Sequence, residues 1–470
     1  MLVAGVDSST QSTKVVLCHA EDGRVVATAS APHPPGTEAD PHAWWSALER
    51  AGDGLLTRAA AIGVAGQQHG MIVLDADGEV IRPALLWNDL RSAGAAAALI
   101  GERGGPQWWA DHTGSVPTAS FTVTKLRWLA EHEPANAAQT ALVLLPHDWL
   151  TWRLAGPQRH SRPATDRGDA SGTGYFSPPT SRWLPEVAAS ALGHQVELPR
   201  VAVPAEVVGE TPWGAILSAG TGDNMGAALG LGAGPGDVVV SIGTSGTAFA
   251  VSEVPAADPS GAVAGFADAT GRFLPLVCTV NAALVLSATA ALLGTDLDGL
   301  SALALAAAPG AGGLTLLPYL DGERTPNRPE ATGVLRGLTT GNATPQNLAR
   351  ASVEAVLSSL AEAADLLTTQ GVARRRVLLV GGGARSAAVC QLAPGLLGSD
   401  VLVPEPAEYV AIGAARQAAW ALAGTTEPPD WPASPAAHYS GQPQQQVRLR
   451  YESLREDTST WASSRTVSTR

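Results

Sequence analysis

The chain has 470 residues, of which 45% are hydrophobic and 16% charged. This composition predicts two or three domains with large buried cores and argues against global disorder. The net charge of -13 disfavours nucleic acid and acidic membranes as partners, although local N–H groups can still bind small anions. The three cysteines lie far apart without a Cys-x-x-Cys motif, which indicates a reduced, cytoplasmic protein without a zinc site.

No signal peptide is expected, because Asp7 interrupts the N-terminus before an apolar region is long enough. The uncharged stretch 273–295 is long enough for a membrane span, but its Pro, Asn and Thr residues favour a buried strand followed by a buried helix. The stretch 299–320 is broken by a Pro-Gly-rich turn and is interpreted as helix, turn and strand.

The N-terminus is predicted to form a β-hairpin with a polar tip. Residues 2–6 and 14–18 are apolar runs, and the turn between them carries hydroxyls and one carboxylate. Hydroxyls and turn N–H groups suit phosphate oxygens, Lys14 adds a cation, and Asp7 could hold Mg²⁺ directly or through water. A simple solvated loop is equally compatible with these residues. It is not a Walker A loop, because no Gly-Lys-Ser/Thr follows.

The next predicted strand, residues 61–65, leads into Gly-Gln-Gln-His-Gly. The amides of Gln67 and Gln68 and the imidazole of His69 offer directional donors and acceptors that suit sugar hydroxyls. A structural role for His69 is the alternative. Trp87 lies in a further predicted strand, 84–89, which has a polar end. There it either stacks on a ligand or fills the core.

Residues 141–146 are expected to form a buried strand that leads into a helix with Asp148 in its first turn. The stretch 165–173 is polar and rich in glycine, and it is too irregular for a core element. We expect a loop there, either beside a pocket or on the plain surface.

Asp223 lies at a predicted strand-to-helix turn near the middle of the chain, after the small residues 219–222. A carboxylate on such a rigid edge can carry chemistry, but Asp is also a common helix N-cap. Both roles can coexist. Because a helix N-terminus favours the charged form, Asp223 is expected to be ionised at neutral pH.

The N-terminal pattern recurs in the second half of the chain, where strands 236–242 and 247–252 flank the turn Gly-Thr-Ser-Gly. Two such units suggest a duplicated α/β domain with a cleft between, in which a phosphate chain is gripped from both sides. Gly381, Gly382 and Gly383 follow a strand and let a flat ring lie against backbone, with a bare βα turn as the alternative. The last residues are expected to be disordered.

Together these motifs resemble the FGGY family of carbohydrate kinases. Eight segments occur in family order between about residues 2 and 420. They are Gly-Val-Asp-Ser-Ser-Thr-Gln-Ser-Thr-Lys from residue 5, Gly-Gln-Gln-His-Gly from 66, Leu-Trp-Asn-Asp from 86, Leu-Pro-His-Asp from 145, Gly-Thr-Gly-Asp-Asn from 220, Ser-Ile-Gly-Thr-Ser-Gly from 241, Leu-Pro-Tyr-Leu-Asp-Gly-Glu-Arg-Thr-Pro from 317 and Gly-Gly-Gly-Ala-Arg-Ser from 381.

The resemblance implies an α/β fold of two duplicated actin-like, RNase-H-like domains with a central ligand cleft. The expected boundaries are residues 1–228 for the sugar-binding domain, 229–435 for the nucleotide-binding domain and 436–470 for a tail whose last part is disordered. It further implies ATP and Mg²⁺ as cofactors, cytoplasmic location and a homodimer.

By the same resemblance Asp223 is the general base. Gln68, His69, Asp223, Asn224 and Trp87 are the expected substrate contacts. The residues expected on the nucleotide are Asp7 for Mg²⁺, Thr10, Ser12, Lys14 and Thr244 for phosphates, and Gly382 and Gly383 for adenosine.

The Gln68-His69 pair favours phosphorylation of D-xylulose to the 5-phosphate, since glycerol kinases carry Arg-Glu at this place. Another ketose, a polyol or a sugar acid, such as ribulose or gluconate, remains the alternative substrate. A non-enzymatic, actin-like or Hsp70-like ATP-binding switch is a remote alternative, which would have no use for Asp223 beside Gln68-His69.

Overall fold

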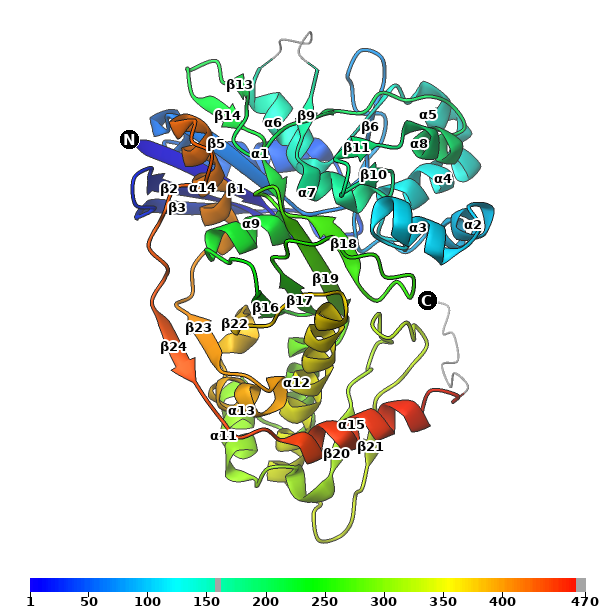
Figure 1. The fold of residues 1–470 in the computed structure, drawn as a ribbon, viewed down its shortest axis with the longest axis vertical. Helices are drawn as coiled ribbons and strands as arrows, with labels where there is room; N and C mark the ends of the chain where they lie inside the picture. The colour runs from blue at the N-terminus through cyan, green and yellow to red at the C-terminus, as the bar shows by residue number, and fades with distance from the viewer. Residues whose placement is uncertain (157–161, 462–470) are drawn as a thin grey trace. The chain divides into compact units, whose positions relative to one another are not determined.

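The computed structural model describes residues 1–156 and 162–461 (Figure 1). The chain forms two compact units. The first unit comprises Met1–Gly234, Val251–Pro275 and Ala407–Ala433, and the second comprises Pro235–Ala250, Leu276–Pro406 and the chain from Ser434 onward.

The first unit contains a large sheet and most of the helices that position the site. Its elements are β1 (Leu2–Ser8), β2 (Ser12–His19), β3 (Val25–Pro32), β4 (Glu38–Ala39), α1 (Pro41–Gly52), η1 (Leu56–Arg58), β5 (Ala61–Gly66), β6 (Ile72–Leu74), β7 (Ala84–Leu85), α2 (Ala93–Glu102), α3 (Pro106–Thr113), α4 (Thr122–His132), α5 (Pro134–Gln139), β8 (Leu142–Leu144), α6 (Pro146–Leu154), β9 (Ala164–Thr165), α7 (Arg167–Ala170), η2 (Ser171–Thr173), β10 (Phe176–Ser177), β11 (Arg182–Trp183), α8 (Pro185–Leu192), β12 (Arg200–Val201), β13 (Val207–Glu210), β14 (Ile216–Ser218), β15 (Thr221–Gly222), α9 (Asp223–Gly230), β18 (Ala264–Ala267) and α14 (Tyr409–Ala423).

The second unit is built on its own sheet, and β19 (Phe273–Thr279) enters it from the first unit. Its other elements are β16 (Asp237–Ile242), β17 (Gly246–Ala250), α10 (Ala283–Leu292), α11 (Leu297–Ala306), η3 (Ala311–Gly313), β20 (Thr315–Leu317), β21 (Val334–Arg336), α12 (Pro345–Thr369), β22 (Arg376–Val380), η4 (Gly382–Arg385), α13 (Ala387–Leu397), β23 (Val401–Pro404), β24 (Ala436–Tyr439) and α15 (Gln445–Asp457).

The sheet of the first unit has the strand order β13-β14-β5-β1-β2-β3, and β15 also pairs with β5. β1 runs antiparallel to β2 and parallel to β5. Because successive side chains of a strand point to opposite faces, the apolar residues of β1 and β2 divide between two cores.

On one face, Val6 and Leu17 pack with Trp44 of α1 and Trp149 of α6. Both helices begin with proline at the first helical position, where its missing N–H costs nothing. On the other face, Val3 and Val16 pack against the alanines of α14, which lies against β1 in Figure 1.

α14 approaches its neighbours at backbone distance, and glycine makes this possible. A Cβ on Gly5 of β1 would lie 1.8 Å from the carbonyl oxygen of Ala411, and one on Gly63 of β5 would lie 2.2 Å from that of Ala414. Gly230 of α9 comes equally close to Tyr409. Such contacts leave no room for a side chain, so the position of β1, β5 and α9 against α14 depends on these glycines.

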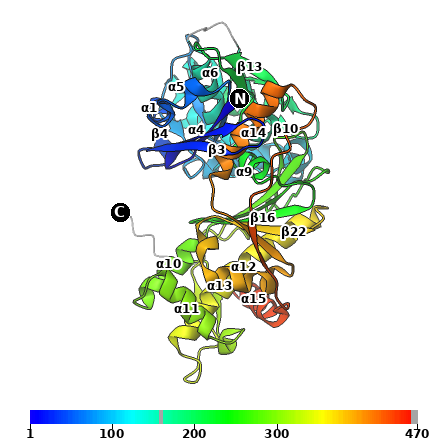
Figure 2. The ribbon, with the colours of Figure 1, turned by 90° about the vertical axis from the view of Figure 1, so that its left-hand side faces the viewer.

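The second sheet has seven strands, and the six after β18 run in the order β19-β17-β16-β22-β23-β24. β16 pairs antiparallel with β17 and parallel with β22. The long helix α12 contacts β17, α11 and α13, and Figure 2 shows α12, α13 and α15 grouped in this unit. Thr344 caps α12 by accepting a hydrogen bond from the Asn347 N–H, and Pro345 begins the helix.

The structure confirms both predicted polar-tipped hairpins, as β1–β2 and β16–β17, and the predicted strands that lead into the Gln68-His69, Asp223 and Gly382 segments. The stretch 273–295 is a strand followed by a helix, as expected. No single helix among the described residues has the length and apolar character to span a membrane; α10 and α11 pass that test only as a pair bent by 86°.

The division of the chain differs from the expected boundaries at 228 and 435. Segments Val251–Pro275 and Ala407–Ala433 group with the first unit. The second of these segments contains α14, which packs on β1, β5 and α9. The expected tail contains β24 and α15, whose buried Val447, Tyr451 and Leu454 lie on one helical face. Residues 462–470, where disorder was expected, lie outside the described residues.

The packing of α15 predicts a stability effect. Leu454 is buried in a cluster with Leu317, Tyr319 and Tyr451, so Leu454→Ala should lower the free energy of unfolding by about 2–5 kcal/mol. Leu449 on the same helix is 46% exposed, and Leu449→Ala should change it by less than about 0.5 kcal/mol. Denaturant titration of both variants checks this; equal losses would show that α15 does not bury its apolar face.

Candidate functional site

Three adjacent parallel strands bring the predicted sugar-side residues together in the first unit. Asp7 of β1 is paired with Ala65 of β5, and Ala65 is paired in turn with Thr221 of β15. The carboxyl ends of parallel strands meet at one edge of a sheet, which is where α/β proteins bind ligands. Asp7, the Gln67–His69 segment and Asp223 therefore converge at that edge.

Asp223 is the first residue of α9, and Gly222 rather than Asp223 occupies the N-cap position. Its Oδ1 accepts hydrogen bonds from the backbone N–H of Asn224 at 2.8 Å and from the Asn224 side-chain amide at 2.9 Å. The same amide donates to Oε1 of Gln68 at 3.1 Å. Asn224 thus joins the candidate base to the candidate sugar contact, and the alternative of Asp223 as a simple N-cap is wrong.

Two influences in the structure oppose the expected effect of the helix end on Asp223. Burial, followed by the charge of Asp7, raises the pKa of Asp223 to about 7, which outweighs its hydrogen bonds from Asn224. Burial likewise raises the pKa of Asp7 to about 6, against the opposing effects of Ser9 and Lys14. The ionised form of Asp223 is therefore less favoured at neutral pH than the helix end alone implies.

Asp7 fits the metal role that the sequence suggested. Its Oδ1 accepts a hydrogen bond from Ser9 Oγ at 2.8 Å, and its charge is close enough to Asp223 to raise the pKa of that carboxyl. In the described part of the chain no three or more His, Cys, Asp or Glu side chains are arranged to hold a metal. One or two carboxylates with substrate phosphates and water is the donor set that Mg²⁺ accepts.

His69 is buried, and its backbone has a φ of 67°. Its Nδ1–H donates to the Gly172 carbonyl at 2.7 Å. A Cβ on Gly172 would lie 2.7 Å from this nitrogen, so only glycine permits the contact. Gln68 is also buried, and Gly222 allows its close approach, since a Cβ there would meet Gln68 Cγ at 2.8 Å. Both side chains are therefore held in fixed positions at the strand ends.

The predicted phosphate residues of the first hairpin lie at the same edge. The Trp87 indole N–H donates to Thr10 Oγ1 at 2.8 Å, and this hydroxyl donates to Gln67 Oε1 at 3.3 Å. Trp87 is 37% exposed, so it is a support for the hairpin tip rather than core. Lys14 forms an ion pair with Glu408 at 2.6 Å. Ser12 begins β2, and its carbonyl accepts from the Ser9 N–H.

Behind Asp223 lies a buried cluster of His147 and three aspartates. His147 Nδ1 is 2.6 Å from Asp169 Oδ2, and Nε2 is 3.2 Å from Asp148 Oδ1. Asp166 Oδ2 accepts from Thr221 Oγ1 at 3.0 Å, two residues before Asp223. The expectation of a loop at 165–173 is therefore wrong: this segment forms α7 and η2 and is buried throughout, where Asp169 bonds to His147 and Asp166 bonds to Thr221.

The ionisation of this cluster is coupled. Burial alone would lower the pKa of His147, but Asp148, Asp169 and Asp166 raise it to about 9. Burial raises the pKa of Asp148 to about 7 and that of Asp169 to about 6. The folded cluster thus holds protons at pH values where separate aspartates in water have lost them.

The predicted nucleotide residues Thr244, Gly382 and Gly383 lie in the second unit, around one cavity of about 680 Å³. A Cβ on Gly383 would lie 2.2 Å from Ile242 Cγ2 of β16, whereas a Cβ on Gly382 would meet no atom within 4 Å. Gly383 is therefore required for packing on the sheet, and Gly382 leaves its side of the cavity open. Leu297, Leu300 and Leu286 supply apolar walls.

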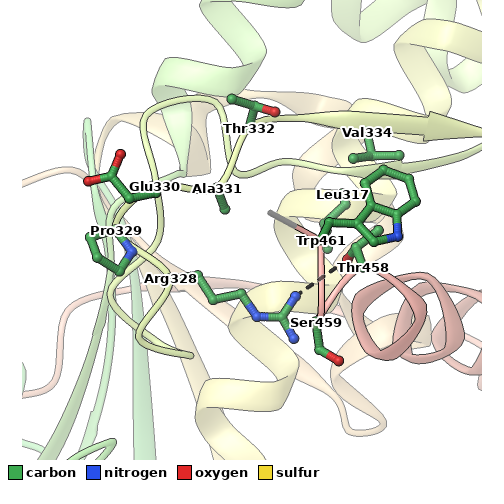
Figure 3. Close-up of a pocket in the computed structure, with 10 residues that line it drawn as sticks. All are labelled: Leu317, Arg328, Pro329, Glu330, Ala331, Thr332, Val334, Thr458, Ser459 and Trp461. Carbon is green, nitrogen blue, oxygen red and sulfur yellow. Dashed lines mark hydrogen bonds between the residues drawn. The ribbon is translucent and has the colours of Figure 1, made fainter. Parts of the chain in front are cut away.

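A second hollow of about 220 Å³ lies in the same unit, between the 328–334 segment and the end of α15 (Figure 3). Arg328 points toward Thr458 there and donates to its Oγ1 and to the Arg455 carbonyl. The guanidinium thereby fastens the loop that follows the Asp321–Pro326 motif to α15. Within that motif, Glu323 is buried and accepts from the Val280 N–H and the Asn281 amide, so it is a structural tie.

Sequence reasoning missed several residues that contact the site. Lys125 reaches His69 from α4, Glu408 pairs with Lys14 from the far end of the chain, and Asp166 bonds to Thr221. Lys125 could have been found from the sequence, because a lysine inside the apolar start of a predicted helix indicates a specific role. Nothing local in the sequence marks the other two, because their partners are distant in the chain.

A phosphate-suited hairpin, a carboxylate pair and a sugar-suited Gln-His segment on one α/β unit, with a ligand-sized cavity on another, define a phosphotransferase for small polyhydroxy compounds. The family model for the N-terminal domain of the FGGY family of carbohydrate kinases matches residues 2–232, and that for the C-terminal domain matches residues 238–422. The chain belongs to the FGGY family of carbohydrate kinases. A non-enzymatic ATP-binding switch is therefore excluded.

Individual relatives agree with this assignment. The chain is 49% identical to a xylulose kinase of Streptomyces coelicolor over 90% of its own length and 88% of the relative, and 37% identical to a xylulose kinase of Escherichia coli over 81% and 82%. The crystal structure of xylulose kinase from Bifidobacterium adolescentis has 45% identity and a TM-score of 0.91, covering 97% of this chain and 99% of that one. The expected two-domain α/β kinase fold is confirmed.

The buried cluster predicts how stability depends on pH. A carboxyl whose pKa is raised on folding contributes stability below its unfolded pKa of about 4, and this is lost as pH rises through the folded pKa. With Asp7 and Asp169 at about 6 and Asp148 and Asp223 at about 7, the first unit should lose stability between about pH 4 and about pH 7.

Asp148→Asn should flatten this pH dependence, because the amide needs no proton to stay neutral. Loss of the Asp148 carboxylate also lowers the pKa of His147. The free energy of unfolding from urea titrations at about pH 4, 6 and 8 checks this. The variant should match the wild type at about pH 4 and exceed it at about pH 8 by on the order of 1 kcal/mol. Asp111→Asn, at an exposed aspartate, is the control; parallel curves for wild type and Asp148→Asn would contradict the account.

Proposed function

We propose that the chain phosphorylates D-xylulose to D-xylulose 5-phosphate with ATP, using Asp223 as the general base. The observation that carries this is the convergence of Asp7, Gln68 and Asp223–Asn224 at the carboxyl ends of three adjacent strands. The substrate is supported by the Gln68-His69 pair and by relatives named as xylulose kinases that align over most of the chain.

The reaction needs positioning and charge stabilisation more than covalent help from the protein. Asp223 takes the proton of the sugar hydroxyl while the hydroxyl oxygen forms a bond to the γ-phosphorus. The bond from that phosphorus to the bridging oxygen breaks, and its electron pair leaves with ADP. A base with a pKa of about 7 is matched to neutral pH, because it is largely available yet holds the proton well.

Gln68 and His69 bind the sugar hydroxyls in this scheme, with Asn224 keeping the Asp223 carboxylate directed toward them. Each amide offers both a donor and an acceptor. Because Asn224 bonds to Gln68 and to Asp223 at once, a shift of the sugar contact would also shift the base. Trp87 influences the substrate indirectly, through its hydrogen bond to Thr10 at the tip of the first hairpin.

Asp7 would hold Mg²⁺, directly or through water, and the metal supplies charge compensation for the outer phosphates. Thr10, Ser12 and Lys14 are the proposed phosphate contacts of the first unit, and Thr244 that of the second. Lys14 exchanges its Glu408 partner for phosphate when the nucleotide binds. Gly382 and Gly383 are proposed to support adenosine at the cavity of the second unit.

A cytoplasmic location is supported by the three free cysteines, Cys18, Cys278 and Cys390. The homodimer remains a prediction from the resemblance alone. Another ketose, a polyol or a sugar acid, such as ribulose or gluconate, remains the alternative substrate, with the chemistry unchanged.

Replacement of the base tests the mechanism. Asp223→Ala should reduce kcat by at least ~10³-fold while ATP binding survives, because the carboxylate acts on the sugar hydroxyl. Coupled ADP release measures turnover, and calorimetric titration with ATP and Mg²⁺ measures binding. Asp22→Ala, at an exposed aspartate of the same unit, should behave as wild type. Near-normal turnover of Asp223→Ala would remove the general-base role.

A sugar panel tests the substrate. D-xylulose should have the highest kcat/KM among D-xylulose, D-ribulose, L-ribulose, glycerol and gluconate in the same ADP-release assay. If a ribulose exceeds D-xylulose by more than about tenfold, which corresponds to ~1.4 kcal/mol in transition-state binding, the proposed substrate is wrong and the proposed chemistry stands.

A further inference from the structure

Lys125 is a fully buried lysine that no part of the proposed chemistry uses. It lies in the first turn of α4 and is 0% exposed. Burial holds its pKa well below the usual range, against the opposing effect of the Asp89 charge. Among the described residues no carboxylate forms a direct ion pair with it. A helix N-terminus also disfavours a positive charge. A lysine is therefore a poor choice for this position on grounds of stability alone.

What Lys125 contacts is the backbone of His69. Its Nζ donates to the His69 carbonyl at 2.7 Å, and Thr122 Oγ1 from the same turn lies 3.4 Å from that oxygen. His69 has a φ of 67°, in the left-handed region that a residue with a Cβ seldom adopts. Such a conformation persists only where the surroundings fix it.

The His69 ring is fixed by the same neighbourhood. Phe121, the residue that precedes α4, places its ring centroid 4.8 Å from that of the imidazole, and the ring centroid of Phe266 lies at 5.8 Å; both rings are tilted against the imidazole. The ring's Nδ1–H donates to the Gly172 carbonyl. Residues of the start of α4 thus hold both the backbone and the ring of His69.

We propose that Lys125 is a positioning residue for the sugar site: its hydrogen bond to the His69 carbonyl holds the Gln68-His69 segment in the conformation that receives the sugar. This rests on the proposed function, in which both side chains bind the sugar. Lys125 acts through the backbone and makes no contact of its own with the substrate or the nucleotide.

The test is Lys125→Met, which keeps an unbranched side chain of similar length and removes the donor. The KM for D-xylulose should rise by about tenfold, equivalent to ~1.4 kcal/mol of binding, with kcat within about threefold and the KM for ATP unchanged. Leu129→Ala is the matched control, since Leu129 is equally buried on α4. It should lower the melting temperature without changing the KM for D-xylulose.

A double-mutant cycle with His69→Ala separates positioning from general destabilisation. His69→Ala should raise the KM for D-xylulose, and adding Lys125→Met to it should raise the KM by less than in the wild-type background, because Gln68 alone is then left to be positioned. A KM unchanged in Lys125→Met, or a rise that persists in full on the His69→Ala background, overturns the proposal while leaving the function intact. No effect of His69→Ala itself would refute the assigned sugar contact, and the positioning role with it.

Discussion

The constraint on which the rest of the site depends is the placement of the buried Asp7 near the partly buried Asp223, where the charge of Asp7 disfavours ionisation of Asp223. Burial is the main cause that raises the pKa of Asp7 to about 6 and that of Asp223 to about 7, and the charge of Asp7 adds to the rise at Asp223. Such a pair is satisfied by a proton or by a cation. A metal near one carboxylate and a substrate hydroxyl near the other supply what a phosphoryl transfer needs.

Backbone packing keeps this pair together. β1, β5 and β15 are in parallel register, and α14 presses on the first two through contacts that only glycine allows at Gly5 and Gly63. Asp166 and Thr221 then tie β15 to the buried His147 cluster. The site therefore combines a rigid sheet edge with a buried polar cluster whose carboxyl groups have raised pKa values. Burying such groups is unfavourable for stability, and it is a common property of functional sites.

Much of the fold could be predicted from local patterns. Apolar periodicity and glycine placement predict the two hairpins, the strands before Gln68, Asp223 and Gly382, and the helices after them. The same segments carry the resemblance to the FGGY family. The predicted site residues Asp7, Gln68, His69, Asp223 and Asn224 were found from such segments, and in the structure they converge at one sheet edge.

The rest depends on contacts between distant residues. The sequence does not show that α14 packs on β1, because the glycines and alanines involved are some 400 positions apart, as Gly5 and Ala411 illustrate. The raised pKa of Asp223 could not be predicted for the same reason: its helix is visible in the sequence, whereas the proximity of Asp7 and the extent of burial are not. The polar stretch 165–173 was assigned to a loop because its partner His147 could not be known.

The most direct measurement is the titration of Asp223 by carbon-13 NMR of protein labelled at the aspartate carboxyl carbons, with the signal assigned from its absence in Asp223→Asn. The account predicts a carboxyl that titrates near pH 7 in the wild type and at a lower pH in Asp7→Asn, where the neighbouring charge is gone. A signal that titrates near the ordinary value of about 4, and is indifferent to Asp7→Asn, would contradict the carboxylate pair on which the site is built.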